Sequence, residues 1–167
     1  IISLKKVSND TYLKIFDGNI FKNKTTPKDY DVINSEAKLI LNDNNFNFIT
    51  GFQSFEDLNL PSSDRYQFIL PYYNFDRQLF SNYEKGSINF SSSGSNDLNN
   101  TNNLRTKIIN DLNYQSSDII SGYGFKNEYN LYLKNLNTIG KNDSVYKSSP
   151  QVEIMSILEL NTSLPMI

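Results

Sequence analysis

The chain has no cysteine, no histidine and no tryptophan. Without cysteine there are no disulfides and no thiolate metal ligands, and without histidine the commonest metal ligand and general base is missing. No run of eighteen apolar residues occurs, which excludes a membrane-spanning helix. Sixteen basic and eighteen acidic residues give a net charge of -2 without a basic cluster, so nucleic acid is not an expected partner.

Aromatic residues are plentiful, with 11 Phe and 11 Tyr among 167 residues. Both types favour β-strands, and Tyr is enriched where membrane proteins meet water. The alternative is that these side chains form the core of a water-soluble β-domain. The mean hydropathy of -0.51 does not decide between the two, because half of the wall of a membrane β-barrel is polar.

The clearest alternation runs from Asp118 to Lys134. Apolar side chains follow one parity and mostly polar side chains the other, which predicts one long strand with an apolar face and a polar face. A strand of this length exceeds the usual five or six residues and suits a tilted bilayer crossing, which takes about nine to eleven. The apolar parity holds Ile119, Tyr123, Phe125, Tyr129, Leu131 and Leu133.

Further strands are predicted along the rest of the chain, and no helix is expected. A hairpin is the clearest: strands 35–41 and 45–56 flank Asn42-Asp43-Asn44, whose residue types suit a tight turn. Pro71 in the next strand predicts a bulge, a strand end or an edge position. The remaining strands are expected at 11–16, 66–75, 85–92, 103–114 and 151–164, with polar loops at 93–100 and 135–150.

The expected connections alternate between short and long. This arrangement is typical of outer-membrane barrels, which have short periplasmic turns and long external loops. The fold class predicted is therefore all-β, an antiparallel meander that forms part of a transmembrane outer-membrane β-barrel. A soluble β-sandwich or solenoid would fit the same pattern.

Several short segments, in this order, resemble the barrel domain of the lipopolysaccharide-assembly outer-membrane protein family LptD, also called organic solvent tolerance protein or OstA. The family has a D-x-x-Y/F-L strand, an S-x-x-x-L strand and a strand that carries LP followed by aromatic residues. The segments are Ser8–Leu13 with Phe16-Asp17, Asp31–Leu39, Asp64–Phe75, Leu104-Arg105 and Ser163–Pro165.

The resemblance implies a translocon that inserts lipopolysaccharide into the outer leaflet of the Gram-negative outer membrane, and no enzyme. It further implies three partners: lipopolysaccharide, an LptE-like plug lipoprotein and a periplasmic Lpt bridge. Residues 1–167 would then be a partial barrel domain of about seven or eight strands, cut from a longer chain. The start at Ile1, without an initiator Met, fits the same expectation.

The candidate functional residues are charged side chains on the polar parities of two predicted strands. In a barrel these side chains would face the lumen: Lys126, Glu128, Lys134, Glu153 and Glu159. They would guide a phosphorylated sugar or simply keep the wall hydrated. No catalytic, cofactor or metal site is predicted, because no nucleophile motif, phosphate loop or calcium-loop spacing is present.

Two alternatives remain open from the residues alone. One is a soluble all-β module that binds a receptor or a carbohydrate. The other is a different outer-membrane barrel, such as a porin.

Overall fold

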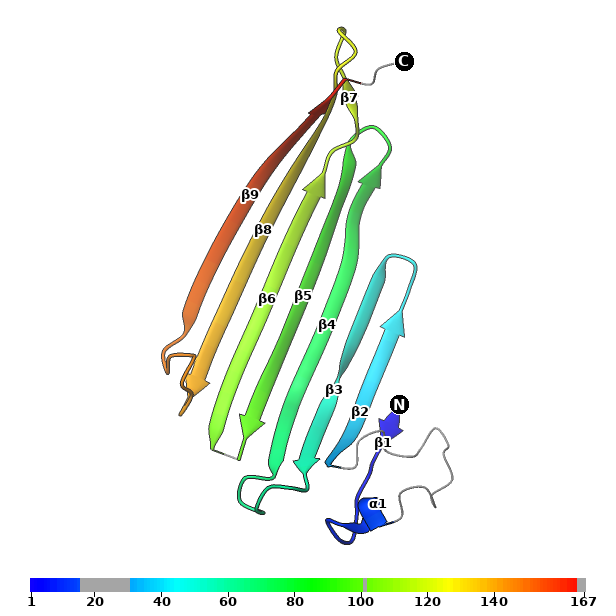
Figure 1. The fold of residues 1–167 in the computed structure, drawn as a ribbon. Helices are drawn as coiled ribbons and strands as arrows, with labels where there is room; N and C mark the ends of the chain where they lie inside the picture. The colour runs from blue at the N-terminus through cyan, green and yellow to red at the C-terminus, as the bar shows by residue number, and fades with distance from the viewer. Residues whose placement is uncertain (16–30, 101, 165–167) are drawn as a thin grey trace.

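The computed structural model describes residues 1–15, 31–100 and 102–164. These residues form one antiparallel sheet of nine strands in the order β1-β2-β3-β4-β5-β6-β8-β7, with β9 beside β8 (Figure 1). The strands are β1 (Ile2–Ser3), β2 (Val32–Asn42), β3 (Phe46–Asp57), β4 (Tyr66–Asn82), β5 (Gly86–Asn99), β6 (Asn103–Gln115), β7 (Ile119–Ile120), β8 (Lys126–Lys141) and β9 (Gln151–Ser163). The predicted all-β antiparallel meander is confirmed.

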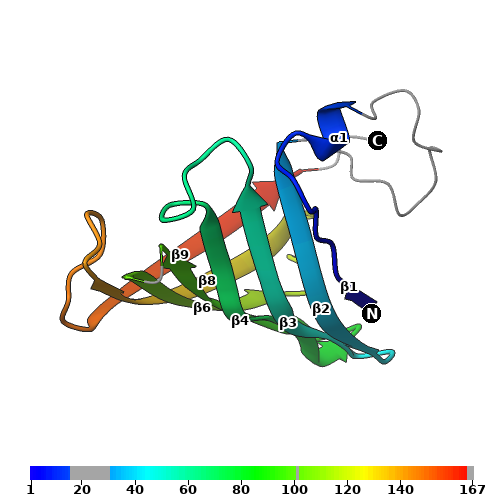
Figure 2. The same cartoon turned by 90° about the horizontal axis from the view of Figure 1, so that it is seen from below.

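The sheet is curved and open. In Figure 2 the ribbons of β2, β3 and β4 stand steeply against those of β6, β8 and β9. β9 pairs with β8 alone, and β1 pairs with β2 alone, so the described residues leave two sheet edges without a neighbouring strand. The longest strands are β4 with 17 residues and β8 with 16.

The predicted strand from 118 to 134 is wrong in its first half. β7 pairs back onto β8, with Ile119 opposite Asn127, and a turn at 121–125 separates the two strands. Gly124 adopts a φ of 82° in this turn, a backbone conformation that glycine takes without steric cost. The alternation of side chains therefore crosses a turn, and the long strand begins at Lys126.

Three further predictions are corrected. The expected loop at 93–100 belongs mostly to β5, and the first part of the expected loop at 135–150 belongs to β8. The expected strand at 11–16 is instead the single helical turn α1 (Tyr12–Ile15), and its last residue, Phe16, lies outside the described residues. No helix in the described part of the chain is long and apolar enough to span a membrane.

The hairpin of β2 and β3 is confirmed, with Asn42 opposite Asn47 across the predicted turn. Of the three possibilities expected at Pro71, the structure shows the bulge, because the pairing of β4 shifts between Ile69 and Tyr72 against both neighbouring strands. The alternation of short and long connections holds for 43–45 and 58–65. It fails between β5 and β6, whose connection is short where a long loop was expected, and at 116–125, which is long where a tight turn was expected.

Paired residues of neighbouring strands point to the same side of a sheet, so the pairing defines two faces. The apolar face contains the row Phe80, Ile88, Tyr114, Leu131 and Leu158. The polar face contains the row Asn47, Asp76, Ser91, Asp111 and Lys134. From each row every second residue stays on the same face, except that the two bulges of β4, at 69–72 and 78–80, each shift its alternation by one residue. Each strand therefore contributes alternate side chains to two chemically different surfaces.

Charged residues of the described strands lie almost entirely on the polar face. The exceptions are Glu56, Arg77 and Lys141, of which Glu56 and Lys141 stand at strand ends. The apolar face is uncovered, and Leu158 on it is 74% exposed. Within the described ranges the only buried apolar cluster is small and lies at the N-terminal corner, where Leu13, Ile33 and Leu58 pack together.

Candidate functional site

The five charged residues predicted as candidates share the polar face of β8 and β9. Lys126, Glu128 and Lys134 alternate along β8, while Glu153 and Glu159 alternate along β9. The pairing places Asn130 opposite Glu159 and Leu136 opposite Glu153, which fixes both strands in one register. The residues are thus on one side of the sheet, as the alternation predicted.

These residues do not converge on one site. Lys126 Nζ lies 2.8 Å from a carboxylate oxygen of Asp118, and Lys134 Nζ lies 3.4 Å from Asp111 Oδ1. Glu128 accepts a hydrogen bond from Gln115 at 2.8 Å. Asp118 and Asp111 therefore balance the two lysine charges, while Glu128, Glu153 and Glu159 leave the strip acidic.

A tighter cluster on the polar face surrounds Glu36 of β2. Its carboxylate accepts hydrogen bonds from Tyr72 at 2.9 Å, from Lys38 at 3.0 Å and from Gln53 at 3.1 Å. The donors come from three neighbouring strands, so the carboxylate ties β2, β3 and β4 together on this face. The sequence analysis did not identify Glu36, because Tyr72 approaches it only through the sheet pairing.

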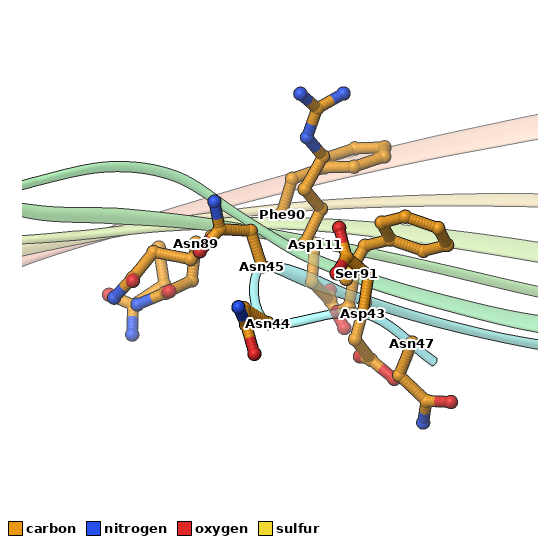
Figure 3. A pocket seen from close by; sticks show the side chains of 13 residues that line it. Asp43, Asn44, Asn45, Asn47, Asn89, Phe90, Ser91 and Asp111 are labelled. Atoms are coloured by element: carbon orange, nitrogen blue, oxygen red, sulfur yellow. The ribbon is translucent and has the colours of Figure 1, made fainter. Parts of the chain in front are cut away.

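A depression of about 470 Å³ lies where the polar face meets the β2–β3 turn. Its lining comes from four strands and the turn, and the labelled side chains are mostly amides and carboxylates (Figure 3). Two of the amide oxygens, Asn47 Oδ1 and Asn113 Oδ1, are buried and accept no hydrogen bond. The other amides and carboxylates of the lining supply acceptors, which suit a ligand that offers hydroxyl or amine donors.

The apolar face carries a belt of polar side chains across its middle, which we call the polar belt: Tyr73, Ser92, Asn110, Asn135 and Asn137. The Tyr73 and Ser92 hydroxyls lie 3.1 Å apart, and Ser92 donates to Asn110 Oδ1 at 2.7 Å. Asn110 Nδ2 then donates to Asn135 Oδ1 at 3.0 Å, and Asn137 donates to the same oxygen at 2.5 Å. The belt links β4, β5, β6 and β8.

The connection at 142–150 is folded around Asp143. The Asp143 carboxylate accepts the backbone N–H groups of Tyr146 and Val145 at 2.7 Å each and the Arg105 guanidinium at 2.8–2.9 Å. The pKa of Asp143 is held below its usual range, chiefly by the hydrogen bond from the Tyr146 N–H. The Val145 N–H and the Arg105 guanidinium lower it further. The Arg105 guanidinium also lies 5.2 Å from the centre of the Tyr146 ring.

At the same end of the strands, Arg65 forms a bidentate ion pair with Asp10. Its Nη1 and Nη2 atoms lie 3.0 and 2.7 Å from the two carboxylate oxygens. The Asp10 hydrogen bond raises the pKa of Arg65. This pair fastens the N-terminal segment to the connection at 58–65. In the described ranges, no three metal-ligating side chains lie close enough together to hold a metal ion.

The arrangement as a whole separates a charged surface from an uncovered apolar one. Neither a family model, nor a curated protein, nor a solved structure matches this chain.

Proposed function

We propose that this chain forms part of the wall of an LptD-like translocon, a β-barrel that carries lipopolysaccharide to the outer leaflet of the Gram-negative outer membrane. The observation that carries the proposal is the uncovered apolar face. On β9 alone, Ile154 is 77% exposed and Leu158 is 74% exposed. A sheet with so much uncovered apolar surface requires an apolar surrounding, and acyl chains provide one.

The strand lengths support the same proposal. β2 and β3, with 11 and 12 residues, reach the length of a bilayer crossing, and the other long strands exceed it. Open sheet edges do not occur in the hydrocarbon region of a membrane, since each unpaired N–H and C=O there is costly. In the proposed barrel, further strands pair with β9 and with the N-terminal edge.

In this proposal the polar face lines a hydrated lumen through which the saccharide passes. The candidate residues Lys126, Glu128, Lys134, Glu153 and Glu159 then face the lumen, beside an LptE-like plug. The periplasmic Lpt bridge would deliver lipopolysaccharide to the periplasmic end of the barrel. These partners rest on the resemblance of the sequence motifs.

A photocrosslinking residue tests the function in cells that carry the complete protein in their outer membrane. Placed at Lys134 or Glu128, it should give adducts with lipopolysaccharide that disappear when transport to the outer membrane is stopped. The same residue at Ser144, in an exposed connection, is the control. A protein that resides in the membrane but gives no such adduct at either polar position would indicate another kind of barrel, such as a porin.

The polar belt favours a second candidate, a soluble all-β module that binds a receptor or a carbohydrate. Between the polar belt and the end of the sheet that carries the β4–β5 hairpin, the unbroken apolar zone covers only 88–90 on β5 and 129–133 on β8. At about 3.3 Å per residue, this zone is roughly 10–17 Å tall, shorter than the apolar band of about 25 Å on membrane barrels. A second protein layer would cover such a face equally well, and the depression near Asn47 and Asn113 would then take the ligand.

A further inference from the structure

The junction between β6 and β8 has no short hairpin to set its register. β6 ends at Gln115 and β8 begins at Lys126, and the chain forms β7 between them. A tight turn fixes which residues of two strands face each other, whereas a longer excursion leaves that choice to the side chains. The register observed here places Asn110 opposite Asn135.

The alternation of side chains alone does not select this register. A slip by two residues keeps every side chain of β6 and β8 on its own face. A slip that sets Asn110 against Leu133 would also set Leu104 against Ile139 and Leu112 against Leu131, so the apolar pattern does not exclude this register. Only features that occur once in the pairing distinguish the native register from its neighbours.

The Asn110–Asn135 pair is such a feature. Asn110 Nδ2 donates to Asn135 Oδ1 at 3.0 Å, and the two residues are part-buried. The next rows pair Leu112 with Leu133 and Ile108 with Asn137. A slip in one direction would set the Asn110 amide against Leu133, which has no polar side-chain atom, and a partly buried amide without a partner is costly. A slip in the other direction would set it against Asn137, whose amide could replace that of Asn135, so the pair discriminates against the first slip alone.

Neighbours on both sides hold the two amides in place. Ser92 on β5 donates to Asn110 Oδ1, and Asn137 donates to Asn135 Oδ1. Both amides are therefore oriented, so that the Asn110 NH₂ group points at Asn135. A slip would break these contacts together with the central one.

We propose that the Asn110–Asn135 pair is a register lock, which excludes the slipped pairing of β6 with β8 in which Asn110 would face Leu133. The principle resembles the single buried asparagine that sets the register of a coiled coil. The lock operates whether the apolar face meets lipid or protein, so the inference stands apart from the proposed function.

The test uses the absence of cysteine. Two cysteines introduced as Ile109→Cys and Leu136→Cys face each other in the native register. Ile109→Cys with Lys134→Cys, and Lys107→Cys with Leu136→Cys, are paired only after the slip that sets Asn110 against Leu133. Diagonal neighbours have Cβ atoms about 7–8 Å apart, whereas a disulfide needs about 3.5–4.5 Å, so mild oxidation reports the register.

In the parent chain we expect the native pair to form a disulfide and the slipped pairs to remain reduced. In chains that also carry Asn110→Leu and Asn135→Leu, the yield of slipped disulfides should rise at least tenfold. The apolar replacement keeps volume on this face, so the strands still pair. The control is Leu112→Ile with Leu133→Ile in the adjacent row, which should leave the slipped pairs reduced.

Exclusive formation of the native disulfide in the Asn110→Leu, Asn135→Leu chain would overturn the proposal and assign the register to another feature. A second variant, Asn110→Ala with Asn135→Ala, covers the case in which the leucine variant fails to fold. Its methyl groups carry neither donor nor acceptor, so it too should allow the slipped disulfides. Native disulfides alone in this variant would contradict the lock in the same way.

Discussion

The two ends of the sheet are stabilised in opposite ways. At the N-terminal corner, Leu13, Ile33 and Leu58 are each less than 7% exposed. Arg65 forms an ion pair with Asp10 of the N-terminal segment. At the other end, Ile154 and Leu158 of β9 are about three-quarters exposed, and β9 has a strand on one side alone. The corner therefore supplies its own apolar contacts, whereas β9 depends on its backbone pairing and on whatever surface covers its apolar side chains.

The largest effect is expected from truncation in the corner. Ile33→Ala should lower the free energy of unfolding by about 2–5 kcal/mol, because it leaves a cavity beside Leu13 and Leu58. Leu131→Ala, a partly exposed residue on the apolar face, is the matched truncation and should cost clearly less in water. Denaturant unfolding measures both. Equal losses would mean that the apolar face is as well packed as the corner.

A charge on the apolar face should be costly in a bilayer and nearly free in water. Leu158→Arg should destabilise the chain in lipid vesicles by about 2–4 kcal/mol, provided that the side chain sits near the bilayer midplane. Glu159→Arg, one position along on the polar face, is the control and should change little. Equal effects of the two variants in vesicles would remove the distinction between the faces.

Gly86→Ala should destabilise the β4–β5 hairpin by about 1–3 kcal/mol. Gly86 has a φ of 92°, and a Cβ there would lie 2.0 Å from the backbone oxygen of Gln115. Gly122 has open space around its Cβ position, so Gly122→Ala is the control. Amide exchange along β4 and β5 reports the loss, and unchanged exchange in Gly86→Ala would contradict the observed turn.

The smallest effect is expected in the connection at 142–150. The folded-state pKa of Asp143 is lowered, so its contribution is complete above the unfolded pKa of about 3.9 and is lost as the pH falls through the folded value. Acid should therefore release the hydrogen bond from Gly140 N–H to the Lys147 carbonyl, which amide exchange detects. Asp143→Asn should weaken it above the folded pKa and remove its dependence on acid, and acid-insensitive protection in the parent would contradict this role.

The sequence predicted those elements in which the pattern and the turn chemistry agree. The alternation of Leu39 and Leu41 with Lys38, followed by Asn42-Asp43-Asn44, led directly to the β2–β3 hairpin. Pro71 likewise identified the bulge in β4. The separation of Lys134 and Glu159 from the apolar side chains also followed from parity alone.

The errors arose where composition and pairing disagree. Ser91–Ser95 in β5 is a serine-rich segment with small side chains on both faces, so nothing in its pattern distinguishes it from a loop. Its neighbours β4 and β6 supply the pairing that makes it a strand. The polar belt and the cluster at Glu36 were missed for the same reason, since their members come from separate strands and meet only once the register is set.

The central claim is that the apolar face contacts acyl chains, and depth-dependent quenching tests it most directly. A fluorophore on Leu158→Cys and one on Glu159→Cys are compared, in a chain that contains no other cysteine, after insertion of the complete protein into vesicles with brominated lipids. If the apolar face contacts acyl chains, we expect strong quenching at position 158 and weak quenching at position 159. Equal and weak quenching at both positions, with position 158 shielded by protein, would contradict it and favour the soluble binding module.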